Sequence, residues 1–296
     1  MKLYEISRAT RESFLRASLD VERIERLIRG AIVEDLDGGD DVTSISTISP
    51  SHRSSAEFRV RVAGVVSGID IAVAVLEMIG LAEIQVLEKD GNFISAGTVL
   101  IQVTGNTREI LLAERTSLNF LGHLSGISSL TRKWVDEVSD FPTKIRDTRK
   151  TTPGYRELEK YAVRMGGGTN HRMSLKDSAL IKDNHIAAAG GVSEAFSMVR
   201  TTYPSIEVEV EVDTLDQLIE IIPFNPDLVL LDNMSVTECK KAVELVRARF
   251  PLEASGGLTI ENAKAYAQSG VDFLAVGALT HSAKVLDIGL DLKAEI

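Results

Sequence analysis

The sequence is poor in cysteine and in long apolar runs. Cys239 is the single cysteine among 296 residues, so no intrachain disulfide framework can form, and its helical surroundings indicate a thiol without a role. The most apolar region, residues 68–86, is interrupted by three acids, and no run reaches the roughly 18 residues of a membrane span. The first twenty residues lack the continuous apolar core of a signal peptide. We therefore expect a soluble protein of the cytoplasm.

Several motifs of known catalytic chemistry are also missing. The sequence has no H-E-x-x-H, no C-x-x-C and no G-x-x-x-x-G-K-[ST], and no ordering of a Ser-His-Asp triad. A zinc site, a P-loop and a hydrolase triad therefore lack support. Positive charge is scarce overall, because 33 Lys and Arg stand against 43 Asp and Glu, a net charge of −10. This balance argues against non-specific binding of nucleic acid, whose phosphates need a basic surface.

One segment departs from this acidic balance. Residues 144–182 contain ten Lys or Arg and four acids, a net charge of +6, which leaves −16 for the rest of the chain. Clustered cations repel one another, and an anionic ligand between them removes that cost. The segment therefore predicts a site for an anion.

The first part of the chain mixes helical and strand-like patterns. Apolar spacing predicts, in chain order, a helix over 21–36, a strand beginning at 56, a helix over 70–80 and short strands over 82–105. A long helical pattern starts at Thr107, and Gly122 and Gly126 are expected to weaken or kink it. These patterns predict a mixed α/β domain before about residue 117.

From residue 143 onward, short apolar runs alternate regularly with helical segments. The runs, each expected to form a strand, cover 143–147, 179–183, 206–212, 227–232, 252–255 and 272–277. The helical segments lie near 155–165, 192–201, 214–222, 235–249 and 259–269. This alternation predicts a parallel sheet in a closed or nearly closed β/α barrel. Six strands are fewer than eight, so either the barrel is incomplete or the pattern conceals a strand.

In such barrels the C-terminal ends of the strands form the active face. The cations that come from different strand ends and loops and are expected to converge there are Arg149, Lys150, Arg172 and Lys182, with His171 beside them. Arg pairs with carboxylates and phosphates through parallel hydrogen bonds, and Lys acts as a compact charge. Three other cations, Arg156, Lys160 and Arg164, lie in an amphipathic pattern near Glu157 and Glu159, and we interpret them as a salt-bridged helix face.

Acidic residues in two neighbouring strands predict a metal site. Glu207, Glu209 and Glu211 alternate along one strand and share the side that faces the lumen of a barrel. Glu211 and Asp232 end adjacent strands, and a carboxylate pair without His or Cys ligands suits Mg²⁺ where phosphates also bind. The alternative is an ion pair in the lumen with Lys182.

Glycine-rich loops offer a place for phosphate. "SGG" (255–257) and "GALTHS" (277–282) follow the last two strands, where barrels often bind phosphate through backbone N–H groups. His281 is a candidate contact, and the alternative is a helix-capping or surface histidine. The run "RMGGGTNHR" (164–172) permits close approach of the backbone to a ligand.

Taken together, these motifs resemble the quinolinate phosphoribosyltransferase family. The resemblance rests on "ERTSLNFLGHLSGI", "RDTRKTTPG", "EKYAVRMGGGTNHRMSLKDSALIKDNHI", "EVEVDTLDQL", "LLDNM", "EASGGL" and "VGALTHS", and it is strongest over 113–289. It implies that quinolinate and phosphoribosyl pyrophosphate give nicotinate mononucleotide, pyrophosphate and CO₂, in de novo NAD biosynthesis. It also implies an N-terminal α/β sandwich over 1–117, joined by the tail 283–296, an incomplete six- or seven-stranded barrel over 118–282, and a homodimer with shared sites.

The resemblance also implies roles for individual residues. Arg115 would be donated across the dimer interface to the partner's site. The quinolinate carboxylates would be held by Arg149, His171, Arg172 and Lys182. Lys150 would reach the pyrophosphate, and Glu211 and Asp232 would organise Mg²⁺ and the ribose hydroxyls; these three would be the catalytic residues. The 5-phosphate would be surrounded by Ser255, Gly256, Gly277 and His281.

Two other functions stay open. A related phosphoribosyltransferase could use another acceptor such as nicotinate, although one carboxylate needs fewer converging cations than two. A non-catalytic anion-binding protein is the second alternative, although such a protein has little use for paired acids beside its ligand.

Overall fold

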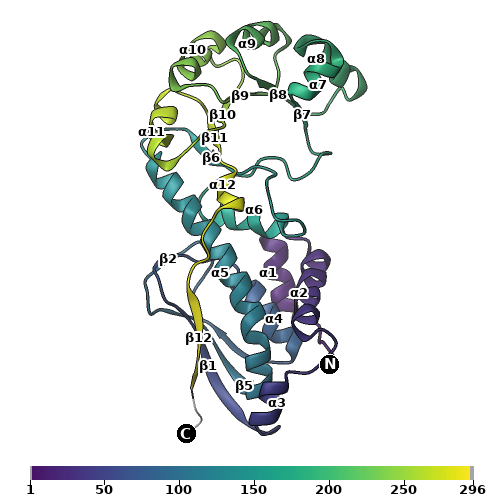
Figure 1. Cartoon of the computed structure of the whole chain (residues 1–296), viewed down its shortest axis with the longest axis vertical. Helices are drawn as coiled ribbons and strands as arrows, with labels where there is room; N and C mark the ends of the chain where they lie inside the picture. The colour runs from purple at the N-terminus through teal and green to yellow at the C-terminus, as the bar shows by residue number, and fades with distance from the viewer. Residues whose placement is uncertain (1, 294–296) are drawn as a thin grey trace. The chain divides into compact units, whose positions relative to one another are not determined.

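The computed structural model describes residues 2–293 and contains two compact units (Figure 1). The first unit comprises Met1–Leu130, Pro153–Gly167 and Ser282–Ile296, and the second comprises Thr131–Thr152 and Gly168–His281. The division falls inside helix α5 (Thr107–Glu137), which continues unbroken past the boundary that the sequence pattern placed near residue 117.

The first unit contains six helices and six strands within the described residues. The remaining helices are α1 (Arg8–Arg16), α2 (Val21–Leu36), α3 (Val42–Thr47), α4 (Ile69–Ile79) and α6 (Arg156–Met165). The strands are β1 (Arg53–Val60), β2 (Gly64–Val65), β3 (Glu83–Val86), β4 (Phe93–Ile94), β5 (Val99–Asn106) and β12 (Ile288–Lys293). The predicted helices and strands of this region are confirmed, whereas α1 and α3 had not been predicted.

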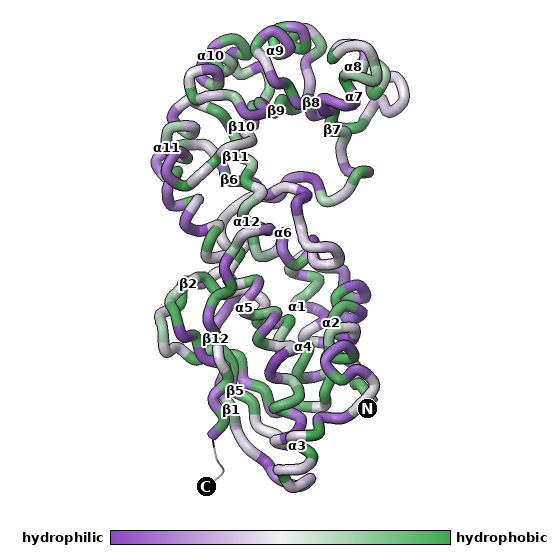
Figure 2. The backbone as a smooth tube through the Cα atoms, in the orientation of Figure 1, coloured by the Kyte–Doolittle hydropathy of each residue, from purple (hydrophilic) through white to green (hydrophobic). Residues whose placement is uncertain are grey.

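An antiparallel sheet with the order β12-β1-β5-β3 forms one layer of the first unit. Helix α4 contacts both α1 and α2, and nearly all its residues are buried. Helix α2 begins after Asp20, whose carboxylate accepts the backbone N–H of Arg23. Its buried residues, Ile24, Ile28 and Ile32, recur every four positions and form one apolar stripe. Alternating hydrophobic and hydrophilic stretches of the helices can be followed in Figure 2.

Helix α5 does not break at its two glycines, contrary to the sequence expectation. The C-terminal segment crosses the helix at this point, and the backbone N–H of Leu286 donates to the Gly122 carbonyl at 3.0 Å. A Cβ at Gly126 would collide with the carbonyl oxygen of Lys284 and lie 3.0 Å from its carbonyl carbon. The glycines therefore serve close packing of two backbones.

Gly126→Ala is expected to lower the free energy of unfolding by about 1–3 kcal/mol, because the added methyl group has no room. Gly30 is the matched control, since it is exposed in α2 and a Cβ there would meet no atom within 4 Å. Gly30→Ala is expected to raise the stability by about 0.5–1 kcal/mol through helix propensity. Denaturant unfolding measures both, and a Gly126→Ala protein as stable as its parent would contradict the packing argument.

The second unit is an open β/α barrel. Its strands are β6 (Lys144–Arg146), β7 (Ala179–Ile181), β8 (Val208–Val212), β9 (Leu228–Asp232), β10 (Leu252–Ser255) and β11 (Phe273–Ala275). Its helices are α7 (Asp183–Ala189), α8 (Val192–Thr202), α9 (Leu215–Ile221), α10 (Val236–Val246), α11 (Ile260–Gln268) and α12 (Ala278–His281), with a 3₁₀ turn, η1 (Ile222–Phe224). The six predicted strands and the helical segments between them are confirmed, whereas α7 and α12 had not been predicted.

All strand pairs of this sheet are parallel, in the order β6-β11-β10-β9-β8-β7. Within residues 2–293 no ladder joins β6 to β7, so the barrel is incomplete, as expected. At this open side Thr169 makes one isolated parallel bridge with Arg146. Helices α8 to α11 lie on the outer side of the curved row of strands (Figure 1).

The strands of the barrel are buried on both sides, which explains their apolar runs. In β8, Val208, Val210 and Val212 are fully buried, whereas Glu209 and Glu211 occupy the alternate positions and line cavities. The lumen-facing positions predicted from alternation are thus confirmed for Glu209 and Glu211, whereas Glu207 precedes the strand and is exposed. Among the helices of the described chain, none combines the length and the apolar character that crossing a membrane requires.

Candidate active site

A cavity of about 710 Å³ lies at the C-terminal ends of the strands in the second unit. Residues selected from the sequence that line it are Arg149, Lys150, His171, Arg172, Lys182, Glu211, Asp232, Ser255 and Gly256. They come from loops after β6, from β7 to β10, and from the glycine-rich loop after β10. The expected convergence of cations and carboxylates at one barrel mouth is therefore present.

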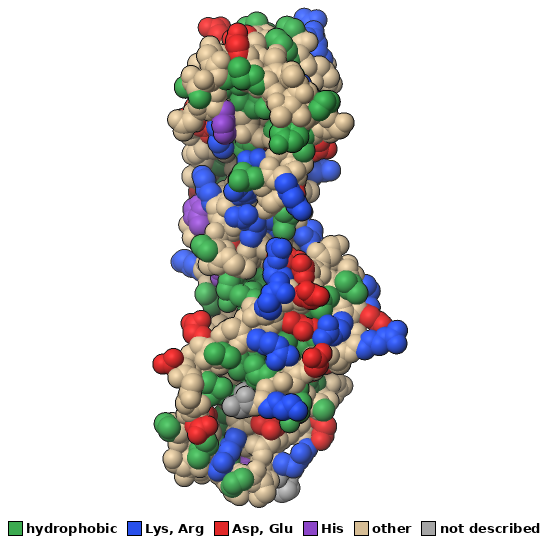
Figure 3. Space-filling view, turned by 90° about the vertical axis from the view of Figure 1, so that its right-hand side faces the viewer, with side chains coloured by type: hydrophobic (Ala, Val, Ile, Leu, Met, Phe, Trp, Pro, Cys, Tyr) green, Lys and Arg blue, Asp and Glu red, His purple; other side chains and the backbone are tan. Residues whose placement is uncertain are grey.

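Two guanidinium groups face the same cavity. Burial lowers the pKa of Arg172, and the charge of Arg149 lowers this pKa further. The Nε atoms of both residues are buried and have no hydrogen-bond acceptor within residues 2–293. Repelling cations with unsatisfied buried donors are stabilised by an anion that accepts from both. In the upper unit of Figure 3, Lys and Arg side chains gather in one zone with few acidic side chains among them.

The loop that carries Arg172 is fixed to strand β6. Thr169 exchanges backbone hydrogen bonds with this strand, donating to Ile145 O at 2.8 Å and accepting from Asp147 N at 3.2 Å. The buried Asp147 carboxylate accepts the backbone N–H of His171 at 2.8 Å. Arg172 Nη1 donates to the Ser178 carbonyl at 2.7 Å. The position of the guanidinium is therefore set by backbone contacts as well as by its own side chain.

The carboxylates of Glu211 and Asp232 line the cavity from neighbouring strands. Burial raises the pKa of Glu211, and the charge of Asp232 raises it further. Burial and the charge of Asp213 raise the pKa of Asp232. Glu211 also forms an ion pair with Lys182 Nζ, so the lumen ion pair considered from the sequence does occur. The other carboxylate oxygens of Glu211 and Asp232 are suitable ligands for a hard cation.

The glycine-rich loops lie beside this acidic pair. Ser255 is the register partner of Asp232, and Gly256 follows it with φ +85°, a conformation that favours glycine. A Cβ at Gly256 would also collide with Oδ1 of Asn233. Gly277 packs against Lys150 and His281, since its Cβ would lie 3.0 Å from Lys150 Cδ and 3.2 Å from His281 Nε2.

Some candidates lie elsewhere. Arg115 is exposed on α5 in the first unit, and its role across a dimer interface stays a prediction. Helix α6, which carries Arg156, Lys160 and Arg164, also belongs to the first unit. Arg164 donates to Ala17 O at 2.7 Å, and Lys160 is fully buried, which the interpretation as a salt-bridged helix face did not anticipate.

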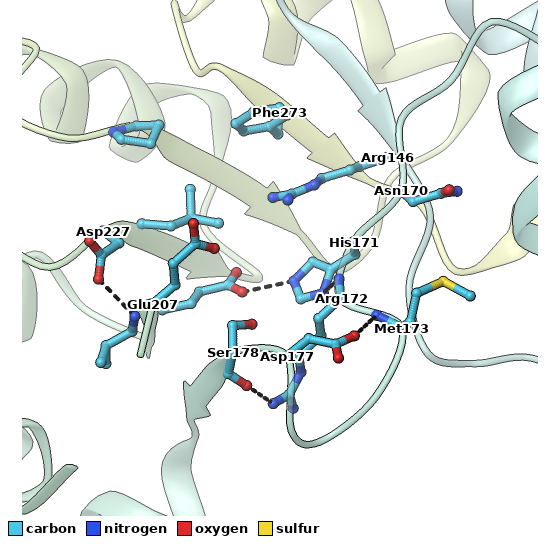
Figure 4. A pocket seen from close by; sticks show the side chains of 14 residues that line it. Arg146, Asn170, His171, Arg172, Met173, Asp177, Ser178, Glu207, Asp227 and Phe273 are labelled. Carbon is cyan, nitrogen blue, oxygen red and sulfur yellow. Dashed lines mark hydrogen bonds and ion pairs between the residues drawn. The ribbon is translucent and has the colours of Figure 1, made fainter. Parts of the chain in front are cut away.

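Sequence reasoning missed Glu253 and a role for Glu209. Glu253 lines the cavity of about 710 Å³. Glu209 lines a second cavity of about 440 Å³, which reaches the start of the strands (Figure 4). Both carboxylates are buried and close to His171, which lines both cavities. An acid inside a short buried strand is unusual, and that signal was available in "LEAS".

Comparison with known proteins agrees with this geometry. The family model described as Quinolinate phosphoribosyl transferase, C-terminal domain, matches residues 127–291, and the N-terminal domain model matches residues 41–125. A nicotinate-nucleotide pyrophosphorylase [carboxylating] of Mycobacterium leprae is 49% identical over 271 residues, which cover 90% of this chain and 95% of that protein.

Solved structures match over similar lengths. Nicotinate-nucleotide pyrophosphorylase from Ehrlichia chaffeensis is 39% identical, with a TM-score of 0.88 over 90% of this chain and 98% of that one. The enzyme of the same name from Francisella tularensis is 38% identical, with a TM-score of 0.89 over 93% and 98%. Both domain models and these relatives agree, and the chain belongs to the quinolinate phosphoribosyltransferase family.

Proposed function

We propose that the protein transfers the phosphoribosyl group of phosphoribosyl pyrophosphate to quinolinate and releases pyrophosphate and CO₂, giving nicotinate mononucleotide for de novo NAD biosynthesis. The observation that carries the proposal is the shared cavity, in which two arginines with unsatisfied buried donors face a pair of carboxylates. Family membership supports the same reaction.

The arginines would bind the acceptor. Quinolinate carries two neighbouring carboxylates, and each guanidinium can donate two parallel hydrogen bonds to one of them. Arg149 and Arg172 would hold this dianion at the lumen side of the cavity, with Lys182 as a further charge. Nicotinate, with one carboxylate, would leave one buried guanidinium unpaired, which disfavours it as acceptor.

The other substrate would lie along Lys150 and the glycine-rich loops. Lys150 would contact the pyrophosphate, and the loop at Ser255 and Gly256, together with Gly277 and His281, would surround the 5-phosphate. Glu211 and Asp232 would hold Mg²⁺, because carboxylate oxygens are its preferred ligands and phosphates and water can complete the set. When bound, Mg²⁺ neutralises charge on the pyrophosphate leaving group.

The chemistry then needs mainly position and charge. Two anions that repel each other are brought together by the cations, and the ring nitrogen of quinolinate attacks C1 of the ribose as the pyrophosphate departs. The C1–O bond to pyrophosphate breaks, and the C1–N bond forms. The adjacent carboxylate then leaves as CO₂, and the electron pair of the broken C–C bond stays on the ring carbon, where the neighbouring pyridinium charge stabilises it until a proton binds there. No general base is required, because the pyridine nitrogen is a free nucleophile.

We also propose that the protein works in the cytoplasm as a homodimer in which Arg115 completes the partner's site. The absence of a second cysteine suits a reducing compartment. An exposed arginine on α5 is a suitable donor to a neighbouring anion site.

A turnover assay tests the reaction. The protein is mixed with phosphoribosyl pyrophosphate and Mg²⁺, and quinolinate and nicotinate are compared while pyrophosphate and CO₂ are measured. We expect quinolinate to release both products in equal amounts, and EDTA to reduce turnover by about 100-fold or more. Binding of quinolinate without either product would favour the anion-binding alternative, and faster turnover with nicotinate would favour the other acceptor.

A further inference from the structure

Three buried polar side chains and the half-buried Arg146 meet in the barrel lumen between the two cavities. Arg146 Nη1 donates to Glu253 Oε2 at 2.9 Å. His171 Nε2 lies 2.8 Å from Glu209 Oε2 and 3.7 Å from Glu253 Oε1. Figure 4 shows His171 between the side chains of Arg146 and Arg172. The four residues come from β6, β8, β10 and the loop after α6, so the cluster ties distant parts of the barrel together.

The cluster looks at first like a metal site. His171, Glu209 and Glu253 each offer a ligand atom, and these atoms lie within 4.8 Å of one another. The hydrogen bonding of the ring argues against a metal. His171 Nδ1 accepts the backbone N–H of Arg172 at 2.8 Å, so the proton of the neutral ring sits on Nε2. Nε2 then has no lone pair for a metal, and it donates to Glu209 instead.

We propose that Glu209 is a positioning residue for the acceptor site, acting through the ring of His171 on the backbone and guanidinium of Arg172. The inference rests on the proposed function, which places Arg172 on a quinolinate carboxylate. It also changes the role of His171, because both ring nitrogens face the protein in the described structure, whereas the resemblance implied a direct substrate contact.

The physical reason lies in how the ring can turn. With Glu209 present, Nε2–H has an acceptor and Nδ1 keeps its lone pair toward the Arg172 N–H. Without Glu209, the acceptor that favours the Nε2–H tautomer is lost. In the other tautomer Nδ1 carries the proton and cannot accept the Arg172 N–H, so two hydrogen-bond donors would face each other. The backbone of Arg172 would then shift, and a bidentate pair with a carboxylate is sensitive to small changes of orientation.

Charge and position predict opposite effects at this residue. The Glu209 carboxylate is an attractive partner of the Arg172 charge, so its removal alone should strengthen binding of an anion nearby. A positioning role predicts weaker binding instead. Gln at this position removes the charge but keeps an oxygen that can accept the His171 Nε2–H. The pair of variants therefore separates the two effects.

The experiment compares steady-state kinetics of Glu209→Ala, Glu209→Gln and the control Glu207→Ala. Glu207 directly precedes β8, two positions before Glu209 in the same alternation, and it is exposed. Glu209→Ala is expected to raise the quinolinate KM by about 10- to 30-fold, with kcat and the KM for phosphoribosyl pyrophosphate changed by less than about threefold. Glu209→Gln is expected to restore the KM to within about threefold of the parent, and Glu207→Ala to match the parent.

Because KM does not depend on the fraction of folded enzyme, partial misfolding of a variant leaves this comparison valid. A quinolinate KM that falls or stays constant in Glu209→Ala would overturn the proposal. An equal rise in Glu209→Gln would overturn it as well, because an oxygen that accepts the His171 Nε2–H would then not be what matters. Equal changes in kcat and both KM values would also overturn it, since they indicate a general loss of structure.

A spectroscopic measurement separates this inference from the proposed reaction. Nitrogen-15 NMR of histidine-labelled protein, with His171 assigned by its absence in His171→Phe, reports which ring nitrogen carries the proton. We expect the Nε2–H form in the parent and in Glu209→Gln, and a mixture in Glu209→Ala. An Nδ1–H ring in the parent would overturn the inference even if quinolinate turns over. Failure of the parent to turn over quinolinate would instead overturn the proposed function, whatever the tautomer.

Discussion

Arg172→Ala is expected to raise the KM for quinolinate by about 100-fold or more, because two charge-assisted hydrogen bonds of about 1.5–3 kcal/mol each are lost. The guanidinium lines the cavity, and its buried Nε has no acceptor among the described residues, so a substrate carboxylate is its natural partner. The effect should fall on quinolinate more than on phosphoribosyl pyrophosphate, whose KM we expect to change by less than about threefold. Initial rates with each substrate varied in turn measure both constants.

Two further variants define what the Arg172 result means. Arg172→Lys keeps the charge but not the two-pronged geometry, so we expect it to recover only part of the loss. Lys176→Ala removes an exposed cation from the same loop, and it should leave the quinolinate KM within about twofold. Arg172→Ala should also narrow the preference for quinolinate over nicotinate, since the second carboxylate loses its partner. An unchanged quinolinate KM would remove Arg172 from the acceptor site.

The barrel could be predicted from the sequence because its strands are buried on both sides. Such strands form unbroken apolar runs, as in "DLVLLD", and each run lies between amphipathic helices. The same logic placed Arg149, Lys150 and Lys182 at one mouth, since parallel strands bring their C-terminal ends together. Arg172 lies in the loop between α6 and β7, so this rule alone does not place it there.

Other features depend on contacts between distant residues, which a pattern does not reveal. From the sequence, Gly126 was expected to weaken its helix. In the structure its missing side chain instead leaves room for the backbone at Lys284 to pack closely. Glu253 lies in a short apolar strand, and its partners Arg146 and His171 come from other elements. The compact units likewise divide within a continuous helix, where composition does not change. In each case the deciding neighbour is far away in the chain.

Asp232→Asn is expected to lower kcat by about 100- to 1000-fold in the presence of Mg²⁺, because the variant retains shape but loses one of two carboxylate ligands. The Mg²⁺ concentration needed for half-maximal rate should rise in parallel. Without metal, however, the same change removes a negative charge beside an anionic substrate, so binding of phosphoribosyl pyrophosphate should become tighter. Turnover titrated with Mg²⁺, and calorimetric binding in EDTA, measure these two opposite effects.

The opposite signs distinguish a metal-binding carboxylate from a structural one. If Asp232 only supported the fold, its loss would weaken substrate binding with and without Mg²⁺. If the protein were an anion sensor that uses no metal, Asp232→Asn would tighten binding of phosphoribosyl pyrophosphate both with and without Mg²⁺, and the parent protein would show no turnover.

Asp213→Asn is the matched control, since Asp213 is exposed and close enough for its charge to raise the pKa of Asp232. It removes one unit of charge near the site but no cavity-lining ligand, so its kcat should stay within about twofold of the parent. A comparable loss of kcat in both variants would mean that the local field, and not coordination by Asp232, controls the rate.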